Sequence, residues 1–127
     1  MAKKILMIED EKVLAEMYGE RLKVEGYEVS RSIDAESGVA IAKEEKPDLI
    51  LLDIILPDAN MDGTDALRKL KADPQTKDIP VILYSNYDTP EVRKIAQEYN
   101  TRYVLKASTT TKDLVNLIRK ELGEELK

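Results

Sequence analysis

The sequence predicts a doubly wound α/β fold, in which helices cover both faces of a five-stranded parallel sheet. Short apolar segments recur at regular intervals, and amphipathic segments with helical spacing lie between them. This alternation is typical of repeated strand-helix-strand units, which place a helix between parallel strands. With 127 residues, of which 43% are hydrophobic and 35% charged, the chain is expected to form one compact core.

The first apolar segment, residues 5–8, shows no alternation, as expected of a strand buried on both faces. Helical spacing predicts a helix over residues 11–25, and Gly26 is suited to a left-handed stop after it. The apolar stripe of this helix is expected to consist of Leu14, Met17, Tyr18 and Leu22. Residues 27–32 alternate between apolar and polar side chains, which predicts an edge strand.

The second helix is expected to begin after Asp34, a suitable N-cap residue, and to end at Pro47. Its inward face is expected to carry Ala35, Val39 and Ala42. Residues 49–52 are continuously apolar and predict a second strand buried on both faces. Residues 64–72 are expected to form the third helix.

Residues 81–84 repeat the apolar pattern of a buried strand. Thr89 and Pro90 are typical of the N-cap and first turn of a helix, which is expected to end near Asn100. Its core-facing residues are expected to be Val92, Ile95, Ala96 and Tyr99.

Residues 103–105 are assigned to the fifth strand from their place in the series. Thr110 and Asp113 have capping-box spacing before the last helix, whose apolar residues are Leu114, Leu117, Ile118 and Leu122. No linker or low-complexity segment interrupts the chain, so residues 1–127 are expected to form a single domain without an output domain.

The composition excludes several function classes, because the chain contains neither cysteine nor histidine. Ser-His-Asp triads, Cys-His pairs, disulfides and zinc sites built on thiolate or imidazole ligands are therefore impossible. The net charge of −5 argues against direct binding to nucleic acid. The apolar segment 5–8 is too short for a signal peptide or a membrane span, so a cytoplasmic location is expected.

Acidic residues end two of the predicted strands: Glu9 and Asp10 end the first, and Asp53 ends the third. These strands are neighbours in a doubly wound sheet, so the three carboxylates are expected to share one pocket. Two carboxylates about 4 Å apart repel each other by about 4 kcal/mol at an effective dielectric constant of about 20. A site with only oxygen ligands suits Mg²⁺, so the sequence predicts a magnesium pocket.

Two further strand ends carry polar residues, Ser85 on the fourth strand and Lys106 on the fifth. Without a histidine base, an anionic pocket built around a metal fits phosphoryl transfer. Asp53 is the expected phosphoryl acceptor, and Lys106 and Ser85 are expected to bind the phosphate oxygens.

From Lys4 to about Leu122, the chain resembles the receiver domain of bacterial two-component response regulators. Five motifs in order support the resemblance: Ile8-Glu9-Asp10, Leu51-Leu52-Asp53 with Pro57, Asp62-Gly63, Tyr84-Ser85, and Tyr103-Val104-Leu105-Lys106. The resemblance implies a flavodoxin-like sheet with the strand order 2-1-3-4-5.

The resemblance implies that Asp53 accepts phosphate from the phosphohistidine of a histidine kinase or a histidine phosphotransfer protein. Asp10, Asp53 and the backbone carbonyl of Ile55 would hold Mg²⁺, with Glu9 acting directly or through water. Lys106 would bind the phosphoryl group. The domain would catalyse its own phosphorylation and slow dephosphorylation without being a conventional enzyme.

The resemblance also implies a switch, in which Ser85 moves towards the phosphate and Tyr103 turns inward. The signal would pass to a target protein through the fourth helix, fifth strand and fifth helix, or by relay of the phosphate. Exposed positions expected on this face are Lys94, Gln97, Asn116 and Arg119.

The sequence departs from the family pattern in three places. Ala107 follows the lysine where proline is usual, which predicts a trans peptide bond. Asn86 is larger than the usual neighbour of the switch hydroxyl and is expected to affect access of phosphate. The segment from Pro57 to Gly63 is two residues longer than the common pattern.

Three other functions are compatible with parts of this pattern. A pseudo-receiver would keep the fold as a protein-binding module without phosphorylation, but all five site side chains are present. A haloacid-dehalogenase-like phosphatase is disfavoured because Asn60, not aspartate, stands two residues before Asp62. A nucleotide carrier is disfavoured because the five glycines form neither dinucleotide nor P-loop motifs.

Overall fold

The computed structural model describes residues 2–54, 61–86 and 88–126. A single five-stranded sheet has the order β2-β1-β3-β4-β5, and all four neighbouring pairs are parallel. The strands are β1 (Lys4–Ile8), β2 (Glu28–Ser32), β3 (Leu49–Asp53), β4 (Val81–Ser85) and β5 (Arg102–Leu105). The predicted fold class and strand order are confirmed.

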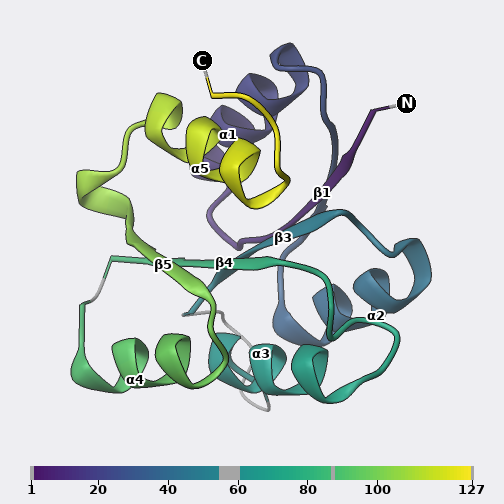
Figure 1. The fold of residues 1–127 in the computed structure, drawn as a ribbon, viewed down its shortest axis with the longest axis vertical. Coiled ribbons are helices and arrows are strands. Elements are labelled where there is room, and N and C mark those ends of the chain that lie inside the picture. The colour runs from purple at the N-terminus through teal and green to yellow at the C-terminus, as the bar shows by residue number, and fades with distance from the viewer. Residues whose placement is uncertain (1, 55–60, 87, 127) are drawn as a thin grey trace.

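Helices cover both faces of the sheet (Figure 1). Helices α1 and α5 lie on one face, and α2, α3 and α4 lie on the other. The helices are α1 (Lys12–Val24), α2 (Ala35–Glu45), α3 (Gly63–Ala72), α4 (Pro90–Glu98) and α5 (Thr111–Glu121), with a short 3₁₀ helix η1 (Lys106–Ser108) after β5. Among the described residues, no helix combines the length and apolar character needed to cross a membrane.

Two apolar cores lie on the two faces, because successive side chains of a strand point in opposite directions. The core beneath α1 and α5 contains Met7, Leu51 and Ile82, and the core beneath α2, α3 and α4 contains Ile8, Leu52 and Leu83. Every residue of β3 and β4 is buried, as the continuous apolar segments predicted. The alternating strand β2 lies at an edge, also as predicted.

Three of the five described helices, α2, α4 and α5, begin at the N-cap residues predicted from the sequence. The Asp34 side chain accepts a hydrogen bond from Ser37 N at 2.8 Å, and Thr89 accepts one from Val92 N at 3.3 Å. The predicted capping box at the start of α5 is present in both directions. Gly26 adopts the expected left-handed conformation, with φ of 97°.

One residue of the predicted α1 stripe is misplaced: Met17 is 47% exposed. The buried residues of α1 are Ala15, Tyr18, Gly19 and Leu22. Met17 lies about 100° around the helix from Tyr18, which turns it away from the sheet. Small residues form part of the inward face, and a search for large apolar side chains overlooks them.

Several element boundaries also differ from the sequence-based expectation. Helix α2 ends at Glu45, and its C-cap residue Lys46, just before Pro47, takes a left-handed conformation with φ of 48°. Helix α3 starts at Gly63, and β5 starts at Arg102. The 3₁₀ helix after β5 was not predicted. No described peptide bond is cis, so the Lys106–Ala107 bond is trans, as predicted.

The expectation that Arg119 is exposed is wrong. Its side chain is 14% exposed, lies 4.0 Å from the Glu25 carboxylate and stacks over the Tyr27 ring at 5.8 Å. Lys94 and Gln97 on α4 are exposed as expected, whereas Asn116 is half-buried.

Candidate functional site

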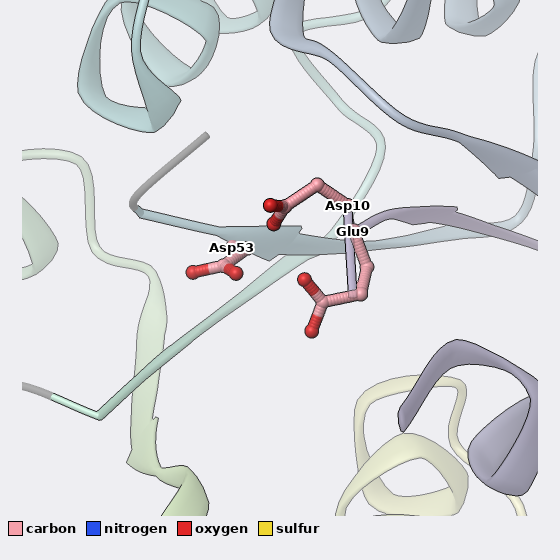
Figure 2. A group of neighbouring side chains, drawn as sticks. All are labelled: Glu9, Asp10 and Asp53. Atoms are coloured by element: carbon pink, nitrogen blue, oxygen red, sulfur yellow. The ribbon is translucent and has the colours of Figure 1, made fainter. Parts of the chain in front are cut away.

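Three carboxylates converge where β1 and β3 end. Glu9 and Asp10 directly follow β1, and Asp53 is the last residue of β3. Ile8 pairs with Leu52 in the sheet, which brings the following residues, Glu9 and Asp53, side by side. One carboxylate oxygen from each of the three acids lies within 4.8 Å of the others. Figure 2 shows the three side chains at this edge of the sheet, so the convergence predicted from the sequence is confirmed.

The three acids differ in their exposure to water. Glu9 is fully buried and Asp53 is 4% exposed, whereas Asp10 is exposed. Burial and the neighbouring Asp53 carboxyl raise the pKa of Glu9, and Lys106 only partly offsets this shift. Concentrated negative charge of this kind favours binding of a cation. All the side-chain donors are carboxylate oxygens, which fits the ligand preference of Mg²⁺.

Lys106, the first residue of η1, supplies a positive charge within this cluster. Its Nζ donates hydrogen bonds of 2.8 Å to Glu9 Oε1 and 2.8 Å to Asp53 Oδ2. The Lys106 side chain is 8% exposed. Burial acts to lower the pKa of its ammonium, but the hydrogen bonds to Asp53 and Glu9 outweigh burial and raise it. Lys106 is therefore a charged member of the site.

An aromatic pair lies beside the lysine. Lys106 Nζ lies 4.8 Å from the centroid of the Tyr84 ring, and the Tyr18 ring packs edge-on against Tyr84 at 6.2 Å. Burial, together with the charges of Glu9 and Asp53, raises the pKa of Tyr84 well above its ordinary value. No site role was predicted for Tyr18 or Tyr84 from the sequence. Tyr84 could have been linked to the site only through the register of the sheet, in which it pairs with Asp53.

Arg31 supports the acidic loop from the neighbouring strand, and this contact was also missed. Its Nε donates to the Glu9 carbonyl oxygen at 3.0 Å, and its terminal nitrogen donates to the Asp10 carbonyl oxygen at 3.0 Å. Glu9 N donates to the Ser32 carbonyl oxygen at 2.9 Å. The edge strand β2 therefore holds the backbone of both acids in place.

The start of α3 packs tightly against the end of β3. Gly63 N donates to the Ile54 carbonyl oxygen at 2.9 Å. Asp62 and Asp65 form a reciprocal capping box at this terminus. A side chain at Gly63 would collide with the backbone of Asp53 and Ile54, so this position needs glycine for close approach.

Some predicted site features fall outside the described residues. These are the Ile55 carbonyl, expected to bind metal, and Pro57 of the family motif. Asn86 is described and exposed at the end of β4. The effect of Asn86 on access of phosphate stays a prediction.

The two predicted switch residues, Ser85 and Tyr103, belong to the face of the sheet that α2, α3 and α4 cover. Ser85, which is buried, has the same strand parity as Leu83, a member of the core beneath α2, α3 and α4. Tyr103 pairs with Leu83 and is half-buried against that same core. Burial and the nearby Asp88 carboxylate raise the pKa of Tyr103. By strand parity, Asp53 and Tyr84 belong to the face covered by α1 and α5, whereas Ser85 and Tyr103 belong to the face covered by α2, α3 and α4. The carboxylates of Glu9 and Asp10 lie on opposite sides of β3 in Figure 2.

Comparisons with known proteins identify a family for this chain. The family model described as the response regulator receiver domain matches residues 5–119. Over 89 residues, 70% of this chain, the sequence is 38% identical to the probable transcriptional regulatory protein TcrX of Mycobacterium tuberculosis. It is 40% identical over 88 residues, 69% of this chain, to the response regulator PleD of Caulobacter vibrioides. The aligned segments span 36% of TcrX and 19% of PleD.

Solved structures show the same architecture. A CheY-like response regulator receiver domain protein from Methanospirillum hungatei superposes with a TM-score of 0.89 and is 28% identical. That match covers 97% of this chain and 95% of the other. The strand order of the sheet therefore agrees with this family.

Proposed function

The chain belongs to the family of response regulator receiver domains of two-component systems, and we propose that it accepts a phosphoryl group on Asp53. Receiver domains are signalling modules. The observation that carries the proposal is the contact between Lys106 Nζ and Asp53 Oδ2 at 2.8 Å, inside a cluster of three carboxylates. A carboxylate at the end of a rigid strand, beside a buried cation, is well placed to act as an acceptor.

The proposed donor is a phosphohistidine of a histidine kinase or a histidine phosphotransfer protein, as is usual for receiver domains. This chain contains no histidine, so the donor group belongs to a partner protein. A carboxylate oxygen of Asp53 attacks phosphorus and forms a P–O bond, giving an acyl phosphate. The P–N bond to the donor imidazole breaks, and its electron pair leaves with the imidazole nitrogen. Little covalent chemistry is required of the protein, so positioning and charge stabilisation supply most of the catalysis.

Asp10, Asp53 and the Ile55 carbonyl would hold Mg²⁺, with Glu9 binding directly or through water. A magnesium ion would neutralise charge on the phosphoryl oxygens. All the proposed ligands are oxygen atoms, which is the ligand type that Mg²⁺ prefers, and this supports the assignment. Arg31 contributes indirectly, since its hydrogen bonds hold the Glu9 and Asp10 carbonyls and thereby the loop that carries both acids.

Lys106 binds the incoming phosphoryl oxygens. Its ammonium already lies against Asp53 and is largely removed from water, which strengthens its attraction to a new negative charge. Ser85 donates a hydrogen bond to the phosphoryl group from the neighbouring strand. Lys106 and Ser85 thus bind the group from the two faces of the sheet.

The phosphorylated state is read at the surface formed by α4, β5 and α5. Ser85 and Tyr103 share a face of the sheet, so movement of Ser85 opens space that the half-buried Tyr103 can occupy. Tyr103 lies near Asp88 and Arg93, which form an ion pair at the start of α4. A change in the orientation of Tyr103 therefore alters the surface at the start of α4, where a target protein docks. Relay of the phosphate to another protein is the alternative output. We place this signalling in the cytoplasm.

The test uses phosphoramidate as donor, with and without Mg²⁺, read by intact-mass spectrometry. A mass increase of about 80 Da, the size of one phosphoryl group, is expected with Mg²⁺ and is expected to be absent in Asp53→Asn. Asp78→Asn, an exposed aspartate in the loop before β4, is the matched control and is expected to gain the same mass.

A pseudo-receiver that only binds proteins is the alternative function. It would gain no phosphoryl mass from phosphoramidate or from a phosphorylated histidine phosphotransfer protein. Absence of the adduct from wild type under both conditions would contradict the proposed function and favour this alternative.

A further inference from the structure

The ammonium of Lys106 faces three different groups in the acidic pocket. Two of its three N–H donors are directed to Glu9 Oε1 and Asp53 Oδ2, each at 2.8 Å. On another side, Nζ lies 4.8 Å from the centroid of the Tyr84 ring. This separation is well within the range of a cation–π interaction. With 8% of the lysine side chain exposed, the ring occupies space that water would otherwise fill.

The Tyr84 ring is held rigidly in this position. Tyr84 pairs with Asp53 across β3 and β4, and Ile54 N donates to the Tyr84 carbonyl oxygen at 3.3 Å. The edge-on Tyr18 ring, inclined by 65°, restrains the orientation of the Tyr84 ring from α1. The phosphoryl acceptor and the ring are therefore fixed to each other through the sheet.

The ring, and not the hydroxyl, makes the contact with the lysine. Tyr84 is 1% exposed. Within the described part of the chain, its hydroxyl forms no well-aligned hydrogen bond, and the group that it faces is the Glu9 carboxyl. The hydroxyl therefore interacts with Glu9, whereas the face of the ring lies against the Lys106 ammonium. The aromatic face is thus the group to which the geometry assigns a role.

We propose that Tyr84 is a positioning residue, whose ring holds the Lys106 ammonium between Glu9 and Asp53 ready for the incoming phosphoryl group. This inference rests on the proposed function for its catalytic consequence, but the positioning itself can be measured separately. A charge held in place before the phosphoryl group arrives needs no reorganisation during the reaction. Without the ring, Lys106 keeps its two carboxylate partners but gains freedom to move between them and water.

Two variants separate the ring from the hydroxyl and from simple core packing. Tyr84→Leu removes the ring, and Tyr84→Phe keeps it. Ile82→Ala is the matched control, because Ile82 lies two residues earlier in β4 and belongs to the same core cluster. Folding of each variant is checked by urea unfolding before its kinetics are measured.

The first readout is the rate of phosphorylation by phosphoramidate at saturating Mg²⁺. Tyr84→Leu is expected to slow it about 2- to 30-fold, the range that cation–π energies correspond to, and Tyr84→Phe is expected to restore it. Ile82→Ala is expected to stay within about twofold of wild type. Equal rates in wild type and Tyr84→Leu, or equal losses in the Leu and Phe variants, would overturn the proposal.

The second readout is the NMR resonance of the Lys106 ammonium, assigned by its absence in Lys106→Met. Its chemical shift is expected to be retained in Tyr84→Phe and Ile82→Ala and to change in Tyr84→Leu. If wild type accepts no phosphoryl group, the proposed function fails, and this resonance alone decides the positioning role. An unchanged resonance in Tyr84→Leu would then refute that role.

Discussion

Gly63 packs against Asp53, the proposed phosphoryl acceptor, so closely that a Cβ atom at position 63 would lie 2.2 Å from the carbonyl oxygen of Asp53. The same atom would lie 2.5 Å from the Ile54 Cα. Both contacts involve backbone atoms, which cannot rotate away as a side chain can. The start of α3 and the end of β3 therefore determine each other's positions.

Gly63→Ala is expected to destabilise the protein by about 1–3 kcal/mol, because the added methyl group forces the backbone of β3 or α3 to shift. Phosphorylation of Asp53 is expected to slow as well. Urea unfolding measures the first effect, and intact-mass kinetics measure the second.

Gly19→Ala is the matched control for this variant. Gly19 lies inside helix α1. A Cβ added there would make an ordinary contact of 3.9 Å with Val29 Cγ1 and no close contact with any other described residue. Alanine is expected to stabilise this helix by about 0.5–1 kcal/mol. Loss of stability in both variants, or in neither, would contradict the assigned contact at Gly63.

Magnesium is expected to stabilise the folded protein through the three-carboxylate cluster. When Mg²⁺ is at 100 times its Kd, binding adds about 2.7 kcal/mol to the free energy of unfolding. Thermal unfolding with increasing MgCl₂, at constant ionic strength, measures this effect. Asp10→Asn removes one proposed ligand and is expected to abolish most of the increase in Tm, whereas Asp78→Asn is expected to retain it. An equal increase in both variants would argue for a different metal site.

Stability without divalent ions is expected to depend on Glu9, whose pKa is raised by burial and by Asp53. Below the ordinary value of 4.5, Glu9 is protonated in both the folded and the unfolded state. As the pH rises, the unfolded chain releases the proton first, so the free energy of unfolding falls until the pH passes the folded-state pKa. Glu9→Gln removes this titration.

The Glu9→Gln variant is therefore expected to gain stability relative to wild type as the pH rises from about 4 to 8. Urea unfolding in EDTA at a series of pH values measures the difference. Glu20→Gln, on the exposed side of α1, is the matched control. A difference between Glu9→Gln and wild type that does not change with pH would be inconsistent with the raised pKa.

The Tyr27 hydroxyl donates a hydrogen bond to the Glu124 carboxylate and anchors the segment after α5. Burial and this hydrogen bond raise the pKa of Tyr27 from 10.0 to about 12. The folded state therefore holds the phenolic proton more tightly than the unfolded state does. Its contribution to stability is fully present below pH 10 and is lost as the pH rises towards 12.

Tyr27→Phe is expected to lose about 1.5–3 kcal/mol near neutral pH, the typical value of a hydrogen bond to a charged group. The difference from wild type is expected to shrink between pH 10 and 12. Denaturant unfolding across this range measures it. A loss that stays constant to pH 12 would show that the hydroxyl is not held in its neutral form.

Tyr84→Phe is expected to be at least as stable as wild type, with a gain of about 1 kcal/mol, because it removes a buried hydroxyl that faces the Glu9 carboxyl without forming a well-aligned hydrogen bond among the described residues. Tyr18→Phe is the comparison within the same aromatic pair. A loss of stability in Tyr84→Phe would reveal a hydrogen bond to its hydroxyl.

Local pattern was sufficient for most of the fold. The Thr110–Asp113 capping box, the Thr89-Pro90 start of α4 and the left-handed Gly26 are properties of a few neighbouring residues, and each was found where predicted. Met17 was misassigned because the inward face of α1 includes Gly19, whose lack of a side chain carries no hydrophobic signal. The α3 capping box at Asp62 was likewise overlooked, since its partner is another aspartate.

The candidate site divides in the same way. Glu9, Asp10, Asp53 and Lys106 could be predicted, because each ends a strand and parallel strands end at a common edge. Arg31 could not, because its role depends on which carbonyl oxygens lie opposite an edge strand. From the sequence, Tyr84 is indistinguishable from an ordinary core residue of a buried strand. Only the register of the sheet places it beside Asp53.

The amino-acid sequence alone determined the succession of strands and helices along the chain, because periodicity and capping depend on residues close in sequence. It also determined the acidic edge and the lysine that belongs to it, because each of these residues ends a strand. The tertiary structure alone decided what lies against that edge: an arginine on two carbonyl oxygens, a glycine against the acceptor's backbone and a tyrosine ring beside the ammonium. Those contacts join residues far apart in the chain. Their distances follow from sheet register and close packing, which become defined only when the whole domain is folded.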